Sequence, residues 1–252
     1  MSLNIHKVFN AFGLEVRLLK NLRKAREDAW KRSELEAWRI LADRKFQTIL
    51  DVGANEGQFA RMARELWPTA TIHSFEPLPQ VHAVLVSAFA GDALFQAHNI
   101  AISDRAGSQV MHCSAFTPSS SLLPMADVHK QEWPQSAEHV EVEVALLPLD
   151  DWARANAPLP GPMLIKIDVQ GFELHVINGG LDTLSKADVV VLEVAFQEFY
   201  EGQPLFADIH ARMHELGFAY RGNVEQYLGK DKSSVLYADA IFTNTRQDKT
   251  HG

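Results

Sequence analysis

The sequence predicts an α/β protein with a Rossmann-like, mostly parallel sheet of about seven strands and helices on both faces. Two observations predict it. Short β-branched and apolar runs alternate with helical patterns from residue 48 to residue 102, and the alternation resumes at residue 163. Acidic residues also follow several of these runs, at the carboxyl ends of strands where open parallel sheets bind ligands.

Each expected element has its own local signal. Residues 33–42 begin with Ser33, and Glu36 three positions later completes a capping-box pattern, so an N-terminal pair of helices is expected to about residue 45. Pro68 ends the first helix of the sheet region. The expected strands are 48–52, 71–75, one within 93–102, 163–168, 187–196 and 237–244, and the expected helices are 58–67, 79–90, 173–184 and 205–216. Residues 107–114 and 139–147 are also expected to be extended, with a Ser/Pro-rich loop between them.

We divide the chain into a helical N-terminal arm (1–45), one α/β domain (46–246) and a disordered tail (247–252). The arm is basic and the body is acidic, because residues 1–45 hold 11 of the 24 Lys and Arg but only 6 of the 32 Asp and Glu. An acidic body argues against nucleic-acid binding. The arm could contact a membrane surface, an anionic substrate or a partner, or it could pack on the acidic body.

Composition limits the class of protein. The hydrophobic content of 46% and the charged content of 22% are ordinary for a soluble globular protein. No apolar run reaches the roughly 18 residues of a membrane span, and the N-terminus lacks a clear signal-peptide pattern. Cys113 is the only cysteine, so no intrachain disulfide can form and a cytoplasmic location is expected. The oligomeric state stays open, a dimer included.

The stretch from Asp51 to Gly57 indicates a nucleotide-type cofactor. Two glycines after a buried strand allow a tight turn and close approach to a ligand, and Glu76 follows at the end of the next strand, where a carboxylate can accept both hydroxyls of a ribose. This pattern fits either NAD or S-adenosylmethionine. Asp51 and Asn55 favour S-adenosylmethionine. The pyrophosphate of NAD is disfavoured beside a carboxylate, whereas the ammonium and sulfonium of S-adenosylmethionine tolerate one.

Seven segments occur in the order seen in FkbM-type methyltransferases, which this chain resembles over about residues 46–244. The segments are LDVGANEGQFA, SFEPLP, NIAISDRAG, SSSL, LPLDDW, IKIDVQGFELHVINGG and DAIFTN. The resemblance implies a class I methyltransferase fold with a reversed C-terminal hairpin. It also implies transfer of a methyl group from S-adenosylmethionine to a hydroxyl of a sugar, glycolipid or polyketide-type molecule. The family often has Glu where Gln170 stands, which makes position 170 a poor candidate for a base.

The resemblance also assigns the cofactor's parts to residues. Asp51 to Asn55 would hold the methionine moiety, Glu76 the ribose, and the segment from Asn99 to Ser103 would frame the adenine. Ser120, in the loop 116–138, could hydrogen-bond the methionine carboxylate or the acceptor. The predicted cofactor-binding residues are Asp51, Gly53, Ala54, Asn55, Gly57, Glu76, Pro77, Asn99, Ala101, Ser103 and Ser120.

Three residues are the catalytic candidates. Asp168 ends a parallel strand beside the expected methyl group and is the first choice for a general base or orienting group. Glu173 lies in the first turn of a helix, where a carboxylate is also favoured for structural reasons. Histidine is a common general base, but His175 lies one turn into the helix and could instead pack or face solvent. Glu193 and Trp133 are expected to contact the acceptor, and the loop 116–138 could close over the site.

Two other readings of the same residues remain open. An NAD-dependent oxidoreductase shares the argument for Glu76, and a non-catalytic binding protein could retain the fold. Asp168, Glu173 and Glu193 could form an oxygen-ligand set for Mg²⁺ or Ca²⁺, but their spacing demands no metal, and none is predicted. The histidines are too scattered for a zinc helix.

Overall fold

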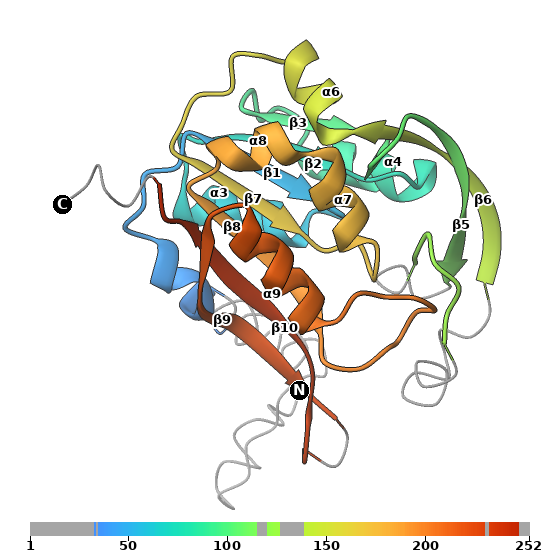
Figure 1. Ribbon diagram of the computed structural model, residues 1–252. Helices are drawn as coiled ribbons and strands as arrows, with labels where there is room; N and C mark the ends of the chain where they lie inside the picture. The colour runs from blue at the N-terminus through green and yellow to red at the C-terminus, as the bar shows by residue number, and fades with distance from the viewer. Residues whose placement is uncertain (1–32, 34, 115–119, 127–138, 230–231, 247–252) are drawn as a thin grey trace, which may run out of the picture. The chain divides into compact units, whose positions relative to one another are not determined.

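The computed structural model describes residues 33, 35–114, 120–126, 139–229 and 232–246 (Figure 1). The chain divides into two units, residues 1–40 and 41–252, and the fold described below is that of the second. Most of the predicted arm and the whole predicted tail, together with Trp133, lie outside the described residues. The boundaries 45/46 and 246/247 therefore stay predictions.

A seven-stranded sheet forms the centre of the second unit, in the order β3-β2-β1-β7-β8-β10-β9. Its strands are β1 (Thr48–Val52), β2 (Thr71–Phe75), β3 (Phe95–His98), β7 (Met163–Ile167), β8 (Val189–Ala195), β9 (Phe218–Leu228) and β10 (Val235–Asn244). The five strands from β3 to β8 pair in parallel, whereas β10 pairs antiparallel with both β8 and β9. The predicted Rossmann-like sheet and its reversed last hairpin are confirmed.

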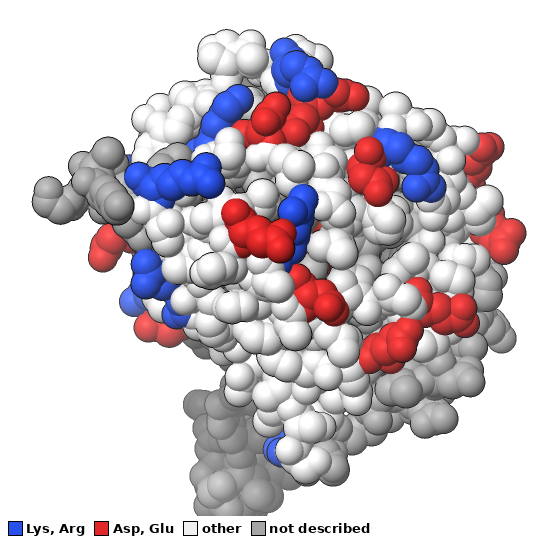
Figure 2. All heavy atoms as spheres, in the orientation of Figure 1, with Lys and Arg blue, Asp and Glu red and all other residues white. Residues whose placement is uncertain are grey.

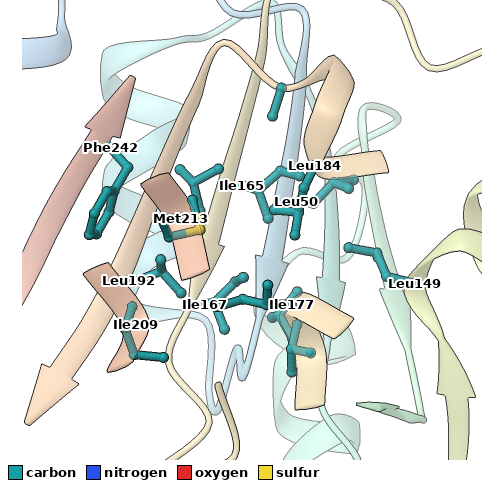
Figure 3. Packing of buried hydrophobic residues seen from close by; sticks show 14 of the residues in the cluster. Leu50, Leu149, Ile165, Ile167, Ile177, Leu184, Leu192, Ile209, Met213 and Phe242 are labelled. Atoms are coloured by element: carbon teal, nitrogen blue, oxygen red, sulfur yellow. The ribbon is translucent and has the colours of Figure 1, made fainter. Parts of the chain in front are cut away.

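Helices cover both faces of this sheet (Figure 1). They are α3 (Gln58–Leu66), α4 (Pro79–Ala88), α6 (Leu149–Ala155), α7 (Glu173–Gly179), α8 (Leu181–Lys186) and α9 (Phe206–Glu215), preceded by a 3-10 turn at Arg39–Leu41. In the main core, Leu50, Ile165 and Ile167 of the sheet pack against the helices α7, α8 and α9 (Figure 3). The residues of these three helices that the figure labels are Ile177, Leu184, Ile209 and Met213. Because side chains alternate along a strand, Asp51 and Lys166 point to the opposite face, which α3 covers.

A second, three-stranded sheet lies between β3 and β7 in the sequence. It consists of β4 (Ala101–Ser103), β5 (Gly107–Ser114) and β6 (His139–Pro148), in the order β4-β6-β5. The extended character of β5 and β6 was predicted, but their separate sheet was not. The predicted strand within 93–102 is also two strands, since β3 joins the large sheet and β4 joins the small one.

Three further elements differ from the sequence prediction. The predicted helix 173–184 is two helices, because the backbone of Gly180 between them is not helical, with φ −129° and ψ 28°. The helix α6 and the strand β9 were not predicted. Among the described residues, no helix is long and apolar enough to cross a membrane. On the face shown in Figure 2, basic and acidic side chains are interspersed and form no basic patch.

Candidate active site

The turn after β1 brings the first two strands together at one edge of the sheet. The backbone N–H groups of Gly53 and Ala54 both donate to the Phe75 carbonyl, over 3.1 and 2.9 Å. Gly53 has a φ of 85°, and an added Cβ would lie 1.8 Å from the Asp168 carbonyl oxygen. Gly57 has the same φ, and its Cβ would lie 2.7 Å from the Phe89 ring. Only glycine fits either position, so the turn is built for close backbone packing.

Glu76 lies directly after β2 and is hydrogen-bonded to the turn that follows β1. Its Oε2 accepts the backbone N–H of Asn55 over 3.0 Å, and its Oε1 accepts that of Leu78 over 2.8 Å. Asn99 braces the same segment, because its side-chain amide donates to the carbonyls of Glu76 and Pro77 over 2.9 and 2.8 Å. Burial raises the pKa of Glu76 to about 7. Each carboxylate oxygen can accept a second donor, so Glu76 retains capacity for a ligand's hydroxyls.

Asp51 is fully buried and only half satisfied. Its Oδ2 accepts the Ser74 hydroxyl over 2.9 Å. Its Oδ1 has no hydrogen-bond partner among the described residues. Burial raises the pKa of this carboxyl to about 6, although Lys166 opposes the rise. A buried carboxylate oxygen without a donor costs free energy, so this atom is a candidate acceptor for a cationic or hydrogen-bonding ligand group.

Lys166 links Asp51 to Asp168. It lies opposite Asp51 in the register of β1 and β7, and its Nζ lies 2.9 Å from Asp168 Oδ2 and 5.6 Å from the centre of the Phe59 ring. Its side chain is 10% exposed. Burial lowers the pKa of Lys166, but Asp168, Asp51 and Asp239 outweigh that effect, and the net direction is upward. The lysine therefore stays charged between two carboxylates.

Gln170 bridges the carboxylates that end β7 and β8. Its Nε2 donates to Asp168 Oδ1 over 2.8 Å and to Glu193 Oε2 over 2.9 Å. Its Oε1 accepts the Tyr200 hydroxyl over 3.0 Å. Burial, followed by the charges of Asp168, Glu173 and Asp239, raises the pKa of Glu193 well above its usual range. Asp239 faces Glu193 across the β8–β10 pair. The far half of the site is thus rich in carboxylates.

The other two catalytic candidates have contacts of a different kind. The Glu173 carboxylate is buried and accepts the backbone N–H groups of Val169 and Gly171 over 3.2 and 3.1 Å, which holds the turn before α7. His175 stacks on Phe172 at 4.0 Å, and its Nδ1 lies 2.8 Å from Asp104 Oδ2. Its polar partner therefore comes from the segment after β4 rather than from the strand ends of the large sheet.

The remaining predicted residues lie in or near the small sheet. Ala101 and Ser103 are buried in β4, and the Ser103 hydroxyl donates to Asp104 Oδ1 over 3.2 Å. Ser120 is buried and lies near Cys113. The site thus brings together Asp51, the glycine turn, Glu76, Asn99, Asp168 and Glu193 along one edge of the large sheet, whereas Ser103 lies in the small sheet and Ser120 in the segment between β5 and β6.

Comparison with known proteins identifies the family. The sequence model described as "Methyltransferase FkbM domain" matches residues 51–220. The chain belongs to the FkbM methyltransferase family. This FkbM protein is 34% identical over 203 residues to the 2-O-methyltransferase NoeI of Sinorhizobium fredii, which covers 76% of this chain and 82% of that one. It is 31% identical over 153 residues to the methyltransferase sdnD of Sordaria araneosa, covering 52% of this chain and 59% of the relative.

Solved structures were compared as well. The magnesium protoporphyrin IX methyltransferase of Synechocystis superposes on the chain with a TM-score of 0.45 and 11% identity, over 96% of this chain and 95% of that one.

Sequence reasoning missed three residues of this FkbM protein's site. Lys166 is a single charge inside the apolar run MLIKI, and a buried strand tolerates a charge only when a partner lies beside it. That signal could have revealed the contact with Asp168. Tyr200 and Asp239 carry no comparable signal. Asp239 meets Glu193 only through the pairing of β8 and β10, and Tyr200 reaches Gln170 only through the path of the loop after β8.

Proposed function

We propose that this FkbM methyltransferase transfers a methyl group from S-adenosylmethionine to a hydroxyl of a small molecule, namely a sugar, glycolipid or polyketide-type compound. The observation that carries the proposal is the buried Oδ1 of Asp51, which has no hydrogen-bond partner in the described part of the chain and lies beside the glycine turn that Glu76 contacts. The similarity to a relative named as a 2-O-methyltransferase supports a hydroxyl as the acceptor.

The residues of the edge fit this cofactor. Asp51 offers an acceptor to the methionine end, directly or through a water molecule. The positive φ of Gly53 and Asn55 turns the chain back at the strand edge, so the backbone can lie close to a ligand. Glu76 can accept the ribose hydroxyls with its remaining lone pairs. Asn99 is proposed to shape the adenine end indirectly, since its amide holds the segment that carries Glu76.

The chain's own residues would do three things for the reaction. Bound S-adenosylmethionine supplies an electrophilic methyl group on a sulfonium, a leaving group that needs no protonation. The protein must therefore align the acceptor oxygen, exclude water and remove one proton. Asp168 is proposed as the orienting group, because Lys166 and Gln170 fix both of its carboxylate oxygens.

The wider assignment follows from the same proposal. Residues 46–246 would form the catalytic domain and the basic arm 1–45 could contact a membrane surface. The partner would be a small-molecule acceptor rather than a nucleic acid, and the location cytoplasmic.

Calorimetric titration tests the cofactor. We expect S-adenosylhomocysteine to bind the full chain and NAD to show no binding. Glu76→Gln should weaken S-adenosylhomocysteine at least about tenfold, because one charge-assisted hydrogen bond contributes roughly 1.5–3 kcal/mol. The matched control is Glu141→Gln on β6, an exposed carboxylate of the small sheet. Binding of NAD without S-adenosylhomocysteine would instead support the oxidoreductase reading.

Methyl transfer is then measured with methyl-labelled S-adenosylmethionine and a panel of methyl hexopyranosides and methyl pentopyranosides. We expect label in the ether fraction of at least one glycoside. Binding of S-adenosylhomocysteine without any transfer would favour a non-catalytic protein or an acceptor outside the sugars.

A further inference from the structure

Two carboxylates meet one amide at the ends of β7 and β8. Asp168 and Glu193 both accept from the same Nε2 of Gln170, over 2.8 and 2.9 Å. Both carboxylates and Gln170 are partly exposed, whereas Tyr200 behind them is buried. An acceptor molecule can therefore reach the carboxylates from solvent, while the tyrosine anchors the amide from the interior.

The two carboxylates are not equivalent. Asp168 uses one oxygen for Lys166, at 2.9 Å, and the other for Gln170. A proton taken up by Asp168 would have to compete with an ammonium or an amide donor. Glu193 uses only Oε2 for Gln170, and among the described residues its Oε1 has no hydrogen-bond partner. Glu193 therefore has an oxygen available for a new proton.

We propose that Glu193 accepts the proton of the acceptor hydroxyl at Oε1, and that Gln170 is the positioning residue that aims it. This inference rests on the proposed function. As the hydroxyl oxygen bonds to the methyl carbon, the carbon–sulfur bond breaks and its electron pair goes to sulfur. The hydroxyl proton passes to Glu193. An alcohol, a sulfonium and a carboxylate become an ether, a neutral thioether and a carboxylic acid, so charge and atoms balance.

Gln170 is held in the orientation that this role needs. Its Oε1 accepts the Tyr200 hydroxyl over 3.0 Å, which leaves the amide hydrogens for the two carboxylates. Its backbone carbonyl accepts the Ser121 hydroxyl over 2.6 Å, and its φ is 54°. A left-handed backbone at a non-glycine residue is strained and persists where the surroundings fix it. A glutamate at this position would lose both donated hydrogen bonds and add a third carboxylate.

The charged and titratable groups around Glu193 come from every neighbouring element. They are Lys166 on β7, Asp168 directly after β7, Glu173 on α7, Tyr200 in the loop after β8, and Tyr237 and Asp239 on β10. Burial and the three carboxylates favour the protonated form of Glu193, and Lys166 opposes them. A base must be ionised to act, so turnover should rise with pH through the pKa of Glu193.

The first test needs no acceptor. Carbon-13 NMR of protein labelled at glutamate side chains is recorded against pH, with and without S-adenosylhomocysteine. Loss of one signal in Glu193→Gln assigns the residue. We expect Glu193 to titrate above the exposed glutamates, and Gln170→Ala to raise its pKa by about one to two pH units, because a hydrogen bond to a charged group is lost. Asp239→Asn should lower it, since a like charge is removed. Titration of Glu193 together with the exposed glutamates, or no response to Gln170→Ala, would overturn the inference.

The second test is turnover with the best glycoside of the panel. Glu193→Gln should reduce kcat by about 10²–10⁴-fold, as for loss of a general base, with unchanged binding of S-adenosylhomocysteine. Gln170→Ala should retain activity but move the acid limb of the pH–rate profile upward, a change that a merely structural residue would not cause. Glu141→Gln is the control and should match the wild type. Wild-type turnover in Glu193→Gln refutes this inference alone. If the wild type methylates no glycoside of the panel, a sugar acceptor is contradicted, and the NMR titration decides about Glu193.

Discussion

Replacing Lys166 with methionine is the most direct test of how the site is held together. Methionine keeps much of the length and the contact with Phe59 but removes the ammonium that lies 2.9 Å from Asp168 and opposite Asp51. Breaking a buried ion pair from one side typically costs 3–5 kcal/mol. Asp168 is 29% exposed and keeps its bond to Gln170, so we expect the lower end, about 3 kcal/mol at pH 8.

The pH dependence of this loss distinguishes an electrostatic role from a packing role. The pKa of Asp51 is already raised from 3.8 to about 6 in the presence of Lys166. A carboxyl with a raised pKa contributes stability below its unfolded pKa, and that contribution is lost as pH rises through the folded pKa. Without Lys166 the folded pKa rises further. The variant should therefore approach the wild type near pH 4 and differ most at pH 7–8.

Urea unfolding followed by circular dichroism at pH 4, 6 and 8 measures the effect, and at pH 8 the melting temperature should fall by roughly 6–12 °C. Lys186→Met is the matched control, because this lysine is exposed at the end of α8 and should change stability by no more than about 0.5 kcal/mol. A loss of equal size at all three pH values, or no loss at pH 8, would show that Lys166 does not balance Asp51 and Asp168.

Three further changes probe other parts of the site. Gly53→Ala should destabilise the fold by more than about 2 kcal/mol and abolish S-adenosylhomocysteine binding. In the control Gly91→Ala, the backbone φ is similar but no atom lies near the added Cβ, so the cost should be only about 1 kcal/mol. Equal losses of stability in thermal melts would count against the packing argument. Glu173→Gln should leave stability unchanged near pH 4 and raise it by up to roughly 3 kcal/mol at pH 8. Burial raises the pKa of Glu173 to about 7, so its ionisation destabilises the fold as pH rises. A loss of stability at pH 8 in urea titrations would contradict this. His175→Ala should change stability by less than about 1 kcal/mol and leave kcat unchanged, whereas a hundredfold loss of kcat would restore His175 as the base.

The sheet could be predicted because its signals are local. The runs 48–52 and 163–167 are mostly apolar, and glycine or an acid follows each, so a few adjacent residues indicate both that a strand is present and where it ends. The proximity of Asp51 and Glu76 follows from parallel neighbours ending at one edge. Local sequence signals therefore sufficed to predict that Asp51 and Glu76 lie close together.

The surroundings of Gln170 and Glu193 were harder to predict because they depend on pairing between distant segments. The β5 and β6 strands form their own sheet, and 24 residues separate Ser114 from His139, so their partners cannot be inferred from either run alone. The bridging role of Gln170 needs Glu193 and Tyr200 to arrive from another strand and loop. From the sequence alone, position 170 can be judged only as a candidate base. That its neutral amide joins two carboxylates becomes visible only in the fold.

Helix α7 packs tightly against strand β4 of the small sheet at Gly179, where an added Cβ would lie 1.8 Å from the Ser103 carbonyl oxygen. The described part of the segment between β5 and β6 makes two further contacts. The Ser121 hydroxyl donates a hydrogen bond to the Gln170 carbonyl, and Met125 forms a β-bridge with Tyr200. For chimaeras between relatives, residues 101–148 are therefore not an exchangeable module. A swap that changes acceptor preference and still folds would have to carry residues 101–180 as one piece, together with the segment that contains Tyr200.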